Sequence, residues 1–180
     1  MNYLPSKYKD CATPKEIEEL KYRFNLLDSD KSGRITFDEL VTAFSTTTFR
    51  FPVAAAKCLI RCVTTQPYIT FDGFVYVDRF VLHCNQVFQH FDHDNTGTLS
   101  SGELPDAMNQ IGFNISAQTA LTLIDTFGSC ARNGLEYPQF LAAASVCCMN
   151  YSLLQQLDTT QSGTITLGFD ELCTLSLWYV

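Results

Sequence analysis

One stretch decides the fold, and it reads Asp28-Ser29-Asp30-Lys31-Ser32-Gly33-Arg34-Ile35-Thr36-Phe37-Asp38-Glu39. Oxygen-bearing side chains stand at its positions 1, 3, 5, 9 and 12, and a glycine stands at position 6. An apolar residue, Ile35, stands at position 8. The spacing gathers many oxygen atoms within a short turn, between two segments with apolar residues at helical intervals.

This spacing is that of a 12-residue EF-hand loop, which surrounds calcium with oxygen ligands and closes the site with a carboxylate at position 12. A second stretch, Asp92 to Glu103, fits equally well, with Gly97 at position 6. The pattern therefore predicts two calcium sites of sensor-range affinity, roughly 10⁻⁷ to 10⁻⁵ M. The alternative is a pair of inactive loops retained for packing. The predicted ligands are Asp28, Asp30, Ser32, the Arg34 carbonyl, Thr36, Glu39, Asp92, Asp94, Thr96, the Thr98 carbonyl, Ser100 and Glu103.

The loop pattern repeats along the chain, with an apolar landmark near the end of each loop. The landmarks follow one another after 34, 30, 36 and 30 residues, and they are Ile35, Ile69, Leu99, Leu135 and Ile165. Such a period indicates an internal repeat of a helix–loop–helix unit. We expect an all-α fold of five EF-hand units in which short β-bridges join the loops in pairs. Ile35 should face Ile69 and Leu99 should face Leu135, which leaves the fifth hand unpaired within the chain.

The expected boundaries follow from helix signals. Thr13-Pro14-Lys15-Glu16 has the arrangement of a capping box, so a helix should begin there and residues 1–12 should form a short flexible tail. Residues 13–180 then form one domain, with hands at about 14–46, 52–80, 76–110, 117–147 and 140–180. The overlaps arise because 72–91 and 136–157 each read as one helix shared by two hands.

The second and fourth loops are predicted not to bind an ion. In the second, Cys62 stands at position 1, Pro67 at 6 and Gly73 at 12, so no carboxylate occupies an anchor position. In the fourth, Arg132 at position 5 would repel a cation. Their expected role is to pair with the first and third loops.

The fifth loop is intermediate. Asp158, Thr160, Ser162 and Thr164 retain the first half of the pattern and form a possible weak site. Phe169 stands at position 12, and the acids Asp170 and Glu171 arrive late, with Glu171 two residues beyond position 12. This loop is therefore two residues longer than the first, and a calcium ion there is doubtful.

Composition excludes several classes. The formal net charge is −7, so the phosphates of a nucleic acid would be repelled and we expect no nucleic-acid partner. No apolar stretch is long enough for a membrane span, and no signal peptide is recognised, which favours a cytoplasmic, reducing location. We expect most of the eight cysteines to be buried thiols. His83 and Cys84 are sequence neighbours that would not face each other on a helix, and His90 and His93 read as surface residues, so we expect no enzyme.

Five EF-hands, the last with a two-residue insertion, resemble the penta-EF-hand family over residues 14–180. The stretches that carry the resemblance are Val87 to Gly97 and the ending Phe169 to Val180. The resemblance implies calcium in the first and third hands and a homodimer or heterodimer through the fifth. The implied interface is Ile165, Phe169, Leu172, Leu175 and Trp178, although this segment could instead fold back on its own chain.

The resemblance also implies a function. Calcium would change an apolar surface that binds Pro-rich or hydrophobic segments of partner proteins, with possible calcium-dependent movement to membranes. We therefore expect a calcium sensor or adaptor. A regulatory subunit of a larger complex, such as a calpain-like protease, is the alternative, and a passive calcium buffer is a third reading.

Overall fold

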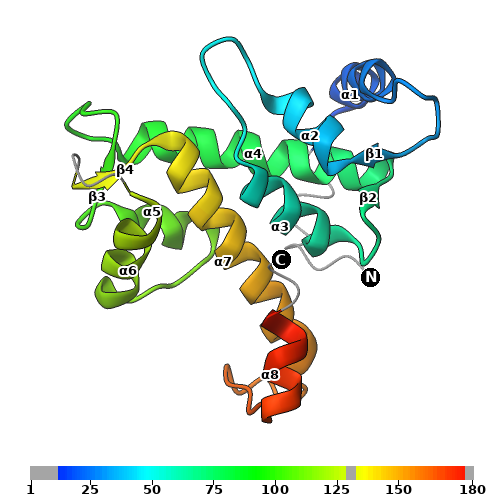
Figure 1. The fold of residues 1–180 in the computed structure, drawn as a ribbon. Helices are drawn as coiled ribbons and strands as arrows, with labels where there is room; N and C mark the ends of the chain where they lie inside the picture. The colour runs from blue at the N-terminus through cyan, green and yellow to red at the C-terminus, as the bar shows by residue number, and fades with distance from the viewer. Residues whose placement is uncertain (1–11, 129–132, 177–180) are drawn as a thin grey trace.

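The computed structural model describes residues 12–128 and 133–176. Eight helices lie in this part of the chain: α1 (Pro14–Leu27), α2 (Phe37–Phe44), α3 (Val53–Val63), α4 (Phe71–Phe91), α5 (Leu104–Ile111), α6 (Ala117–Phe127), α7 (Tyr137–Leu157) and α8 (Phe169–Ser176). Four two-residue strands accompany them: β1 (Ile35–Thr36), β2 (Tyr68–Ile69), β3 (Leu99–Ser100) and β4 (Gly134–Leu135). The all-α architecture with short bridges is therefore confirmed (Figure 1).

Side chains cap the starts of the first two helices. Thr13 and Glu16 form the predicted capping box at the start of α1, and Thr36 and Glu39 form a second one at the start of α2. Because Thr36 takes the cap, α2 begins at Phe37. α3 begins at Val53, directly after Pro52, without a side-chain cap hydrogen bond.

The loops pair as predicted. β1 and β2 are antiparallel with Ile35 opposite Ile69, and β3 and β4 are antiparallel with Leu99 opposite Leu135. All four residues are at most 1% exposed, so each bridge also fills a core position. Gly134 is required at the second bridge because a Cβ there would lie 2.6 Å from the carbonyl oxygen of Leu99.

Two long helices organise the molecule, and each is shared by two hands as predicted. In Figure 1, α4 runs across the molecule from β2 toward the loop that carries β3, and α7 descends from β4 toward α8. α4 leaves the second loop and ends at Asp92, the first residue of the third loop, while α7 leaves the fourth loop and ends at Asp158 in the fifth. The hands are thus joined by rigid helices.

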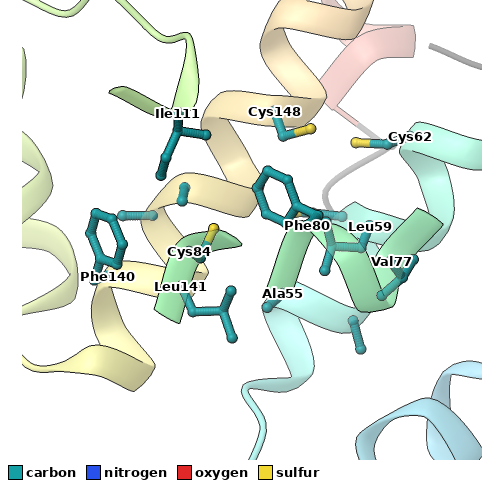
Figure 2. Close-up of a cluster of buried hydrophobic side chains, with 14 of the residues drawn as sticks. Ala55, Leu59, Cys62, Val77, Phe80, Cys84, Ile111, Phe140, Leu141 and Cys148 are labelled. Atoms are coloured by element: carbon teal, nitrogen blue, oxygen red, sulfur yellow. The ribbon is translucent and has the colours of Figure 1, made fainter. Parts of the chain in front are cut away.

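The core lies where α3, α4 and α7 meet. Figure 2 shows Leu59 of α3, Phe80 of α4 and Leu141 of α7 directed into one cluster, and all three are fully buried. Thiols complete the cluster, with Cys62 and Cys148 facing each other across α3 and α7. Among the described cysteines, four are buried, Cys147 is half-buried and only Cys173 is exposed, as expected for a chain with mostly buried thiols.

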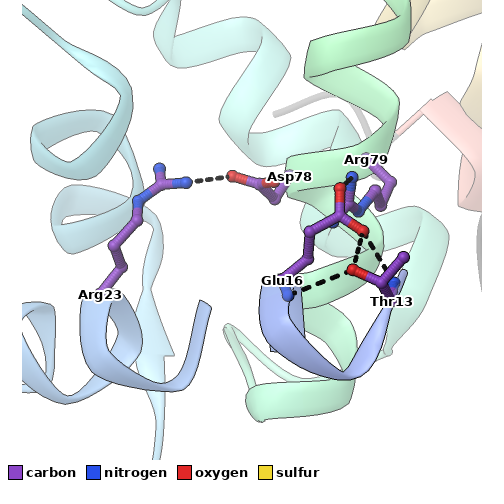
Figure 3. A network of polar contacts seen from close by, with 5 residues as sticks. All are labelled: Thr13, Glu16, Arg23, Asp78 and Arg79. Carbon is purple, nitrogen blue, oxygen red and sulfur yellow. Dashed lines mark hydrogen bonds and ion pairs between the residues drawn. The ribbon is translucent and has the colours of Figure 1, made fainter. Parts of the chain in front are cut away.

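Two ion pairs hold α1 against α4. The guanidinium of Arg23 donates to the Asp78 carboxylate at 2.6 Å, and that of Arg79 donates to Glu16 at 3.0 Å (Figure 3). The Thr13 N–H, the Thr13 hydroxyl and Arg79 together lower the pKa of Glu16 to about 2. The helix that enters the first loop is therefore fixed to the helix that enters the third.

Within the described residues, no helix combines the length and the apolar character that a membrane crossing demands.

Candidate calcium-binding loops

The first half of the first loop is organised by the Asp28 carboxylate. Its Oδ1 accepts from the Ser32 N–H at 2.8 Å and its Oδ2 accepts from the Gly33 N–H at 2.8 Å. Asp30 Oδ1 accepts from the same Ser32 N–H at 3.0 Å, and the Ser32 hydroxyl lies 3.4 Å from the Arg34 carbonyl oxygen. The predicted ligands at positions 1, 3, 5 and 7 therefore converge on one point of the loop.

The sharp turn of the first loop depends on two residues with positive φ. Gly33 at position 6 has φ +73° and Lys31 at position 4 has φ 55°. An L-residue with a side chain adopts this left-handed region at a cost of roughly 1–2 kcal/mol, which glycine avoids. The sharp turn aims the Ser32 and Gly33 N–H groups inward at Asp28.

Glu39, the predicted position-12 ligand, caps α2. Its Oε2 accepts from the Thr36 N–H and the Thr36 hydroxyl, both at 2.9 Å. A bidentate calcium ligand would need both carboxylate oxygens, so calcium and the helix cap compete for Oε2. The closing residue of this loop is thus tied to the position of a helix.

The third loop repeats this geometry. Asp92 accepts from the Thr96 and Gly97 N–H groups, each at 3.0 Å, and Asp94 accepts from the Thr96 N–H at 3.2 Å. The Thr96 hydroxyl lies 3.3 Å from the Thr98 carbonyl oxygen. Four predicted ligands converge here as well.

Glu103 lies differently from Glu39. Its Oε2 accepts from the Ser100 N–H at 3.0 Å and from the Ser100 hydroxyl at 2.7 Å, whereas its Oε1 accepts from the His93 N–H at 3.2 Å. Glu103 therefore already spans the loop from position 12 to position 2. The helix that follows, α5, begins after this residue, whereas α2 begins before Glu39.

Hydrogen bonds hold the loop carboxylates in the charged form. The Ser32 hydroxyl and N–H lower the pKa of Asp30, and the Thr96 hydroxyl and N–H lower that of Asp94. A deprotonated carboxylate is the form that binds a hard cation. The oxygens at positions 1, 3, 5 and 7 converge and are of the kind that calcium binds, whereas the glutamates at position 12 hold cap bonds and would have to turn to join them.

The second and fourth loops contribute pairing, and the carboxylate of Glu136, at position 9 of the fourth loop, caps α7. Cys62 and Val63 lie inside α3, so the second loop is too short to follow the 12-residue pattern. The Arg34 guanidinium stacks on the Tyr68 ring at 4.4 Å, which ties the second loop to the first. Arg132, the cation predicted to exclude calcium from the fourth loop, lies outside the described residues.

The fifth loop has the backbone of the first and third. Gln161 and Gly163 have φ of 55° and 76°, and Asp158 accepts from the N–H groups of Ser162 and Gly163 at 3.0 and 2.6 Å. Position 3 is Thr160 instead of an aspartate, and its hydroxyl donates to the Asp158 carboxylate. Burial alone would raise the pKa of Asp158, but these N–H groups and hydroxyls lower it.

At the end of the fifth loop, the late acid Glu171 makes a cap bond that the 12-residue pattern alone does not contain. Glu171 Oε2 accepts from the Gly168 N–H at 2.6 Å, three residues before it, as Glu39 does from Thr36 and Glu103 from Ser100. Glu171 is therefore the counterpart of position 12, displaced by the two inserted residues. The signal was the shared three-residue interval between cap and acid.

Four of the five predicted interface residues lie in the described part of the chain. Phe169 is 80% exposed and Leu172 is 57% exposed, while Ile165 and Leu175 are half-buried. Leu175 borders a small hollow with Leu157 and Leu167. Trp178 lies outside the described residues. No strand is present in the described fifth loop, in contrast to the four loops before it.

Paired loops with converging oxygens, set in helix–loop–helix units, define a calcium-binding EF-hand protein. The EF hand domain model matches residues 19–47, which contain the first loop.

Relatives confirm the resemblance to the penta-EF-hand family. The chain is 28% identical to peflin of Mus musculus over 179 residues, which is 96% of this chain and 64% of peflin. It thus spans less than two thirds of that relative. A solved structure titled as a homolog of programmed cell death 6 protein from Leishmania major Friedlin is 26% identical, with a TM-score of 0.61, and the match covers 91% of this chain and 95% of that one. Calcium-dependent protein kinase 21 of Arabidopsis thaliana is 31% identical, but only 24% of the kinase is matched.

Proposed function

We propose that this chain is a calcium sensor or adaptor that binds two ions, one in the first loop and one in the third, and changes an apolar partner-binding surface in response. The ligands of the proposal are the twelve residues predicted above, and the fifth loop remains a doubtful third site. One observation supports it most: Glu39 would serve both as a calcium ligand and as the cap of α2.

That double role links the ion to movement. When Glu39 turns both oxygens toward calcium, the cap bonds of Thr36 must lengthen or be exchanged, and the start of α2 shifts. α2 carries Phe44, whose ring packs on Phe51 and Phe74 at centroid distances of 5.2 and 6.0 Å. A shift of α2 would therefore uncover aromatic surface, as sensor EF-hands do when they open.

The test is calcium-dependent exposure of apolar surface. We expect a hydrophobic fluorescent dye to bind the chain with calcium and release it with chelator, and Glu39→Gln to lose most of this change. Lys15→Glu, on the exposed face of α1, is the control. Calcium binding by calorimetry without any change in dye fluorescence would contradict the sensor and favour a buffer, whose hands barely open.

A dimer through the fifth hand belongs to the same proposal. The exposed Phe169 and Leu172 would be covered by a second fifth hand, and the unpaired loop would gain a bridging partner. Light scattering tests this, since a monomer with and without calcium would contradict it. Copurification of a stable heterodimer would favour the regulatory-subunit alternative. We also propose a cytoplasmic location, with calcium-dependent movement to membranes.

A further inference from the structure

Two buried thiols meet between α3 and α7. Cys62 lies in the last turn of α3 and Cys148 in the middle of α7, and they are 1% and 0% exposed. Figure 2 shows their sulfur atoms directed toward each other, and the two thiols share a hydrogen bond. Neither residue belongs to a loop that is proposed to hold calcium. The pair therefore offers a chemistry of sulfur that is separate from the calcium sites.

The helices that carry the pair can approach each other closely. Both contain small buried residues: Ala55 and Ala56 in α3, and Ala143 and Ala144 in α7. Among the helices of the described residues, α3 and α7 share the most extensive packing. Packed helix axes can come within about 8 Å of each other, and each Cα lies about 2.3 Å from its axis. Facing Cα atoms can therefore reach the separation of less than about 7 Å that a disulfide requires.

The neighbouring thiols are less suitable partners. Cys58 stands one turn before Cys62 on the same helix, where Cβ atoms lie about 5–6 Å apart, against about 3.8 Å in a disulfide. Cys147 adjoins Cys148, but side chains adjacent on a helix do not face each other. Cys84 of α4 is fully buried near Cys148 and is the remaining competitor. The shared hydrogen bond distinguishes Cys62 as the partner of Cys148.

We propose that Cys62 and Cys148 form a redox modification site, at which hydrogen peroxide converts the facing thiols into a disulfide that joins α3 to α7. A dithiol reductant restores the two thiols. The proposal is independent of the calcium function. Because α3 precedes the second loop and α7 follows the fourth, the disulfide holds the two loop pairs in one arrangement. In a reducing compartment such a bond forms transiently, as the disulfides of redox sensors do.

The reaction balances with peroxide as the one oxidant. One sulfur, as the thiolate, attacks the O–O bond and becomes a sulfenic acid, and the displaced hydroxide takes up the thiol proton to leave as water. The second thiol attacks the sulfenic sulfur, loses its proton and releases a second water molecule. Burial raises the pKa of Cys148 well above its usual range, so thiolate is scarce and the first step is slow. The site therefore responds to sustained exposure to peroxide.

The test maps the crosslink by mass spectrometry. The full chain, folded and in calcium chelator, is incubated with millimolar hydrogen peroxide, and the remaining thiols are blocked before tryptic digestion without reductant. Tryptic cleavage places Cys58, Cys62 and Cys84 on three separate peptides. We expect peptide 62–79 to be joined to peptide 133–180, lighter than the sum of the two by two hydrogens. Dithiothreitol should separate them again.

Two adjacent thiols provide the matched variants. Cys148→Ala should abolish the crosslink, whereas Cys147→Ala, one residue away, should retain it. Cys62→Ala removes the other partner and supplies the same reading if Cys148→Ala does not fold. The oxidised wild type should unfold at a temperature about 10 °C above that of the reduced protein, because closing a long loop restricts the unfolded chain. Neither Cys148→Ala nor Cys62→Ala should show this rise.

Three results would overturn the proposal. The first is a crosslink that joins the peptides of Cys62 and Cys84, or one that survives Cys148→Ala. The second is a sample in which exposed Cys173 is fully oxidised while Cys62 and Cys148 remain thiols. The third is a mapped crosslink without any rise in the unfolding temperature, because the bond would then not join the helices of the folded protein.

Discussion

The first and fifth loops have nearly the same backbone but different chemistry. Lys31 and Gln161 share a φ of 55°, Gly33 and Gly163 share a positive φ near 75°, and Asp28 and Asp158 accept equivalent N–H bonds. Yet position 3 is an acid in the first loop and Thr160 in the fifth. The loop shape therefore follows from an aspartate at position 1 and a glycine at position 6, whereas the ion requires further carboxylates.

The second difference lies at the ends of these loops. The first loop continues into a strand that pairs with β2, while the described fifth loop has no strand and reaches α8 two residues later. Glu39 and Glu171 each accept from the backbone N–H three residues before them, but only Glu39 stands at the usual distance from the first half of its loop. The insertion separates the cap function from the calcium function.

The largest expected effect is on the number of bound calcium ions, which should differ between variants of Glu39 and of Glu171. Glu39→Gln should remove one of two bound ions, because position 12 supplies the bidentate carboxylate. Glu103→Gln should remove the other, and Glu171→Gln should leave the ion count unchanged. Calorimetric titration measures all three. A single variant that lost both ions would contradict independent sites, and loss of an ion in Glu171→Gln would show that the fifth loop binds calcium.

Gly33→Ala and Gly163→Ala test whether the loop shape is independent of the ion. Each forces an alanine to a positive φ without a steric clash, so each should cost roughly 1–2 kcal/mol of unfolding free energy. Urea unfolding in the presence of chelator measures this. Only Gly33→Ala should lose further stability relative to wild type when calcium is added. Unequal losses of unfolding free energy in the two variants without calcium would show that the two loop backbones are not equivalent.

A variant that gains a calcium site tests the same comparison of the first and fifth loops. Thr160→Asp adds the missing acid at position 3 of the fifth loop, beside Asp158, and should produce a weak third site at about 10⁻⁴ to 10⁻³ M. Ser162→Ala is the matched loss at position 5 of the same loop. If calorimetry found no third binding event at millimolar calcium, the two inserted residues, rather than the missing acid, would be what disables the loop.

The smallest expected effect concerns the anchor of α1. The lowered pKa of Glu16, about 2 against an ordinary 4.5, means that its contribution to stability is present above pH 4.5 and is lost as the pH falls toward 2. Glu16→Gln should therefore be slightly less stable than wild type at neutral pH, and the difference should shrink below pH 4.5. Urea unfolding at several pH values without calcium measures it. A pH-independent difference would assign the effect to packing.

The features that could be predicted from the sequence are those encoded by local spacing. The Thr13 capping box predicted the start of α1 because its residues lie within one turn, and the bridge partners of Ile35 and Leu99 were predicted because each loop repeats the same local pattern. The convergence of the first four ligands in each loop was likewise predictable from the 12-residue pattern.

The features that could not be predicted depend on distant partners. Glu16 and Arg79 are 63 residues apart, and Arg23 and Asp78 are 55 apart, so no local pattern pairs them. The hollow that residues 50–53 share with Phe127 and with Pro138 and Ala142 of α7 likewise joins segments far apart in the sequence. The cap role of Glu39 was missed for another reason: its position in the calcium pattern already supplied an explanation.

The buried thiols of α3 and α7 offer a way to measure how often the core opens. Burial and the neighbouring Cys62 thiol raise the pKa of Cys148 well above its usual range, and burial raises that of Cys58 to about 12. Such groups react with an alkylating reagent only while the helices are apart, because the thiolate is the reactive form and the closed core excludes it. The labelling rate of Cys148 relative to exposed Cys173 therefore reports how often the centre of the molecule opens, without any added probe.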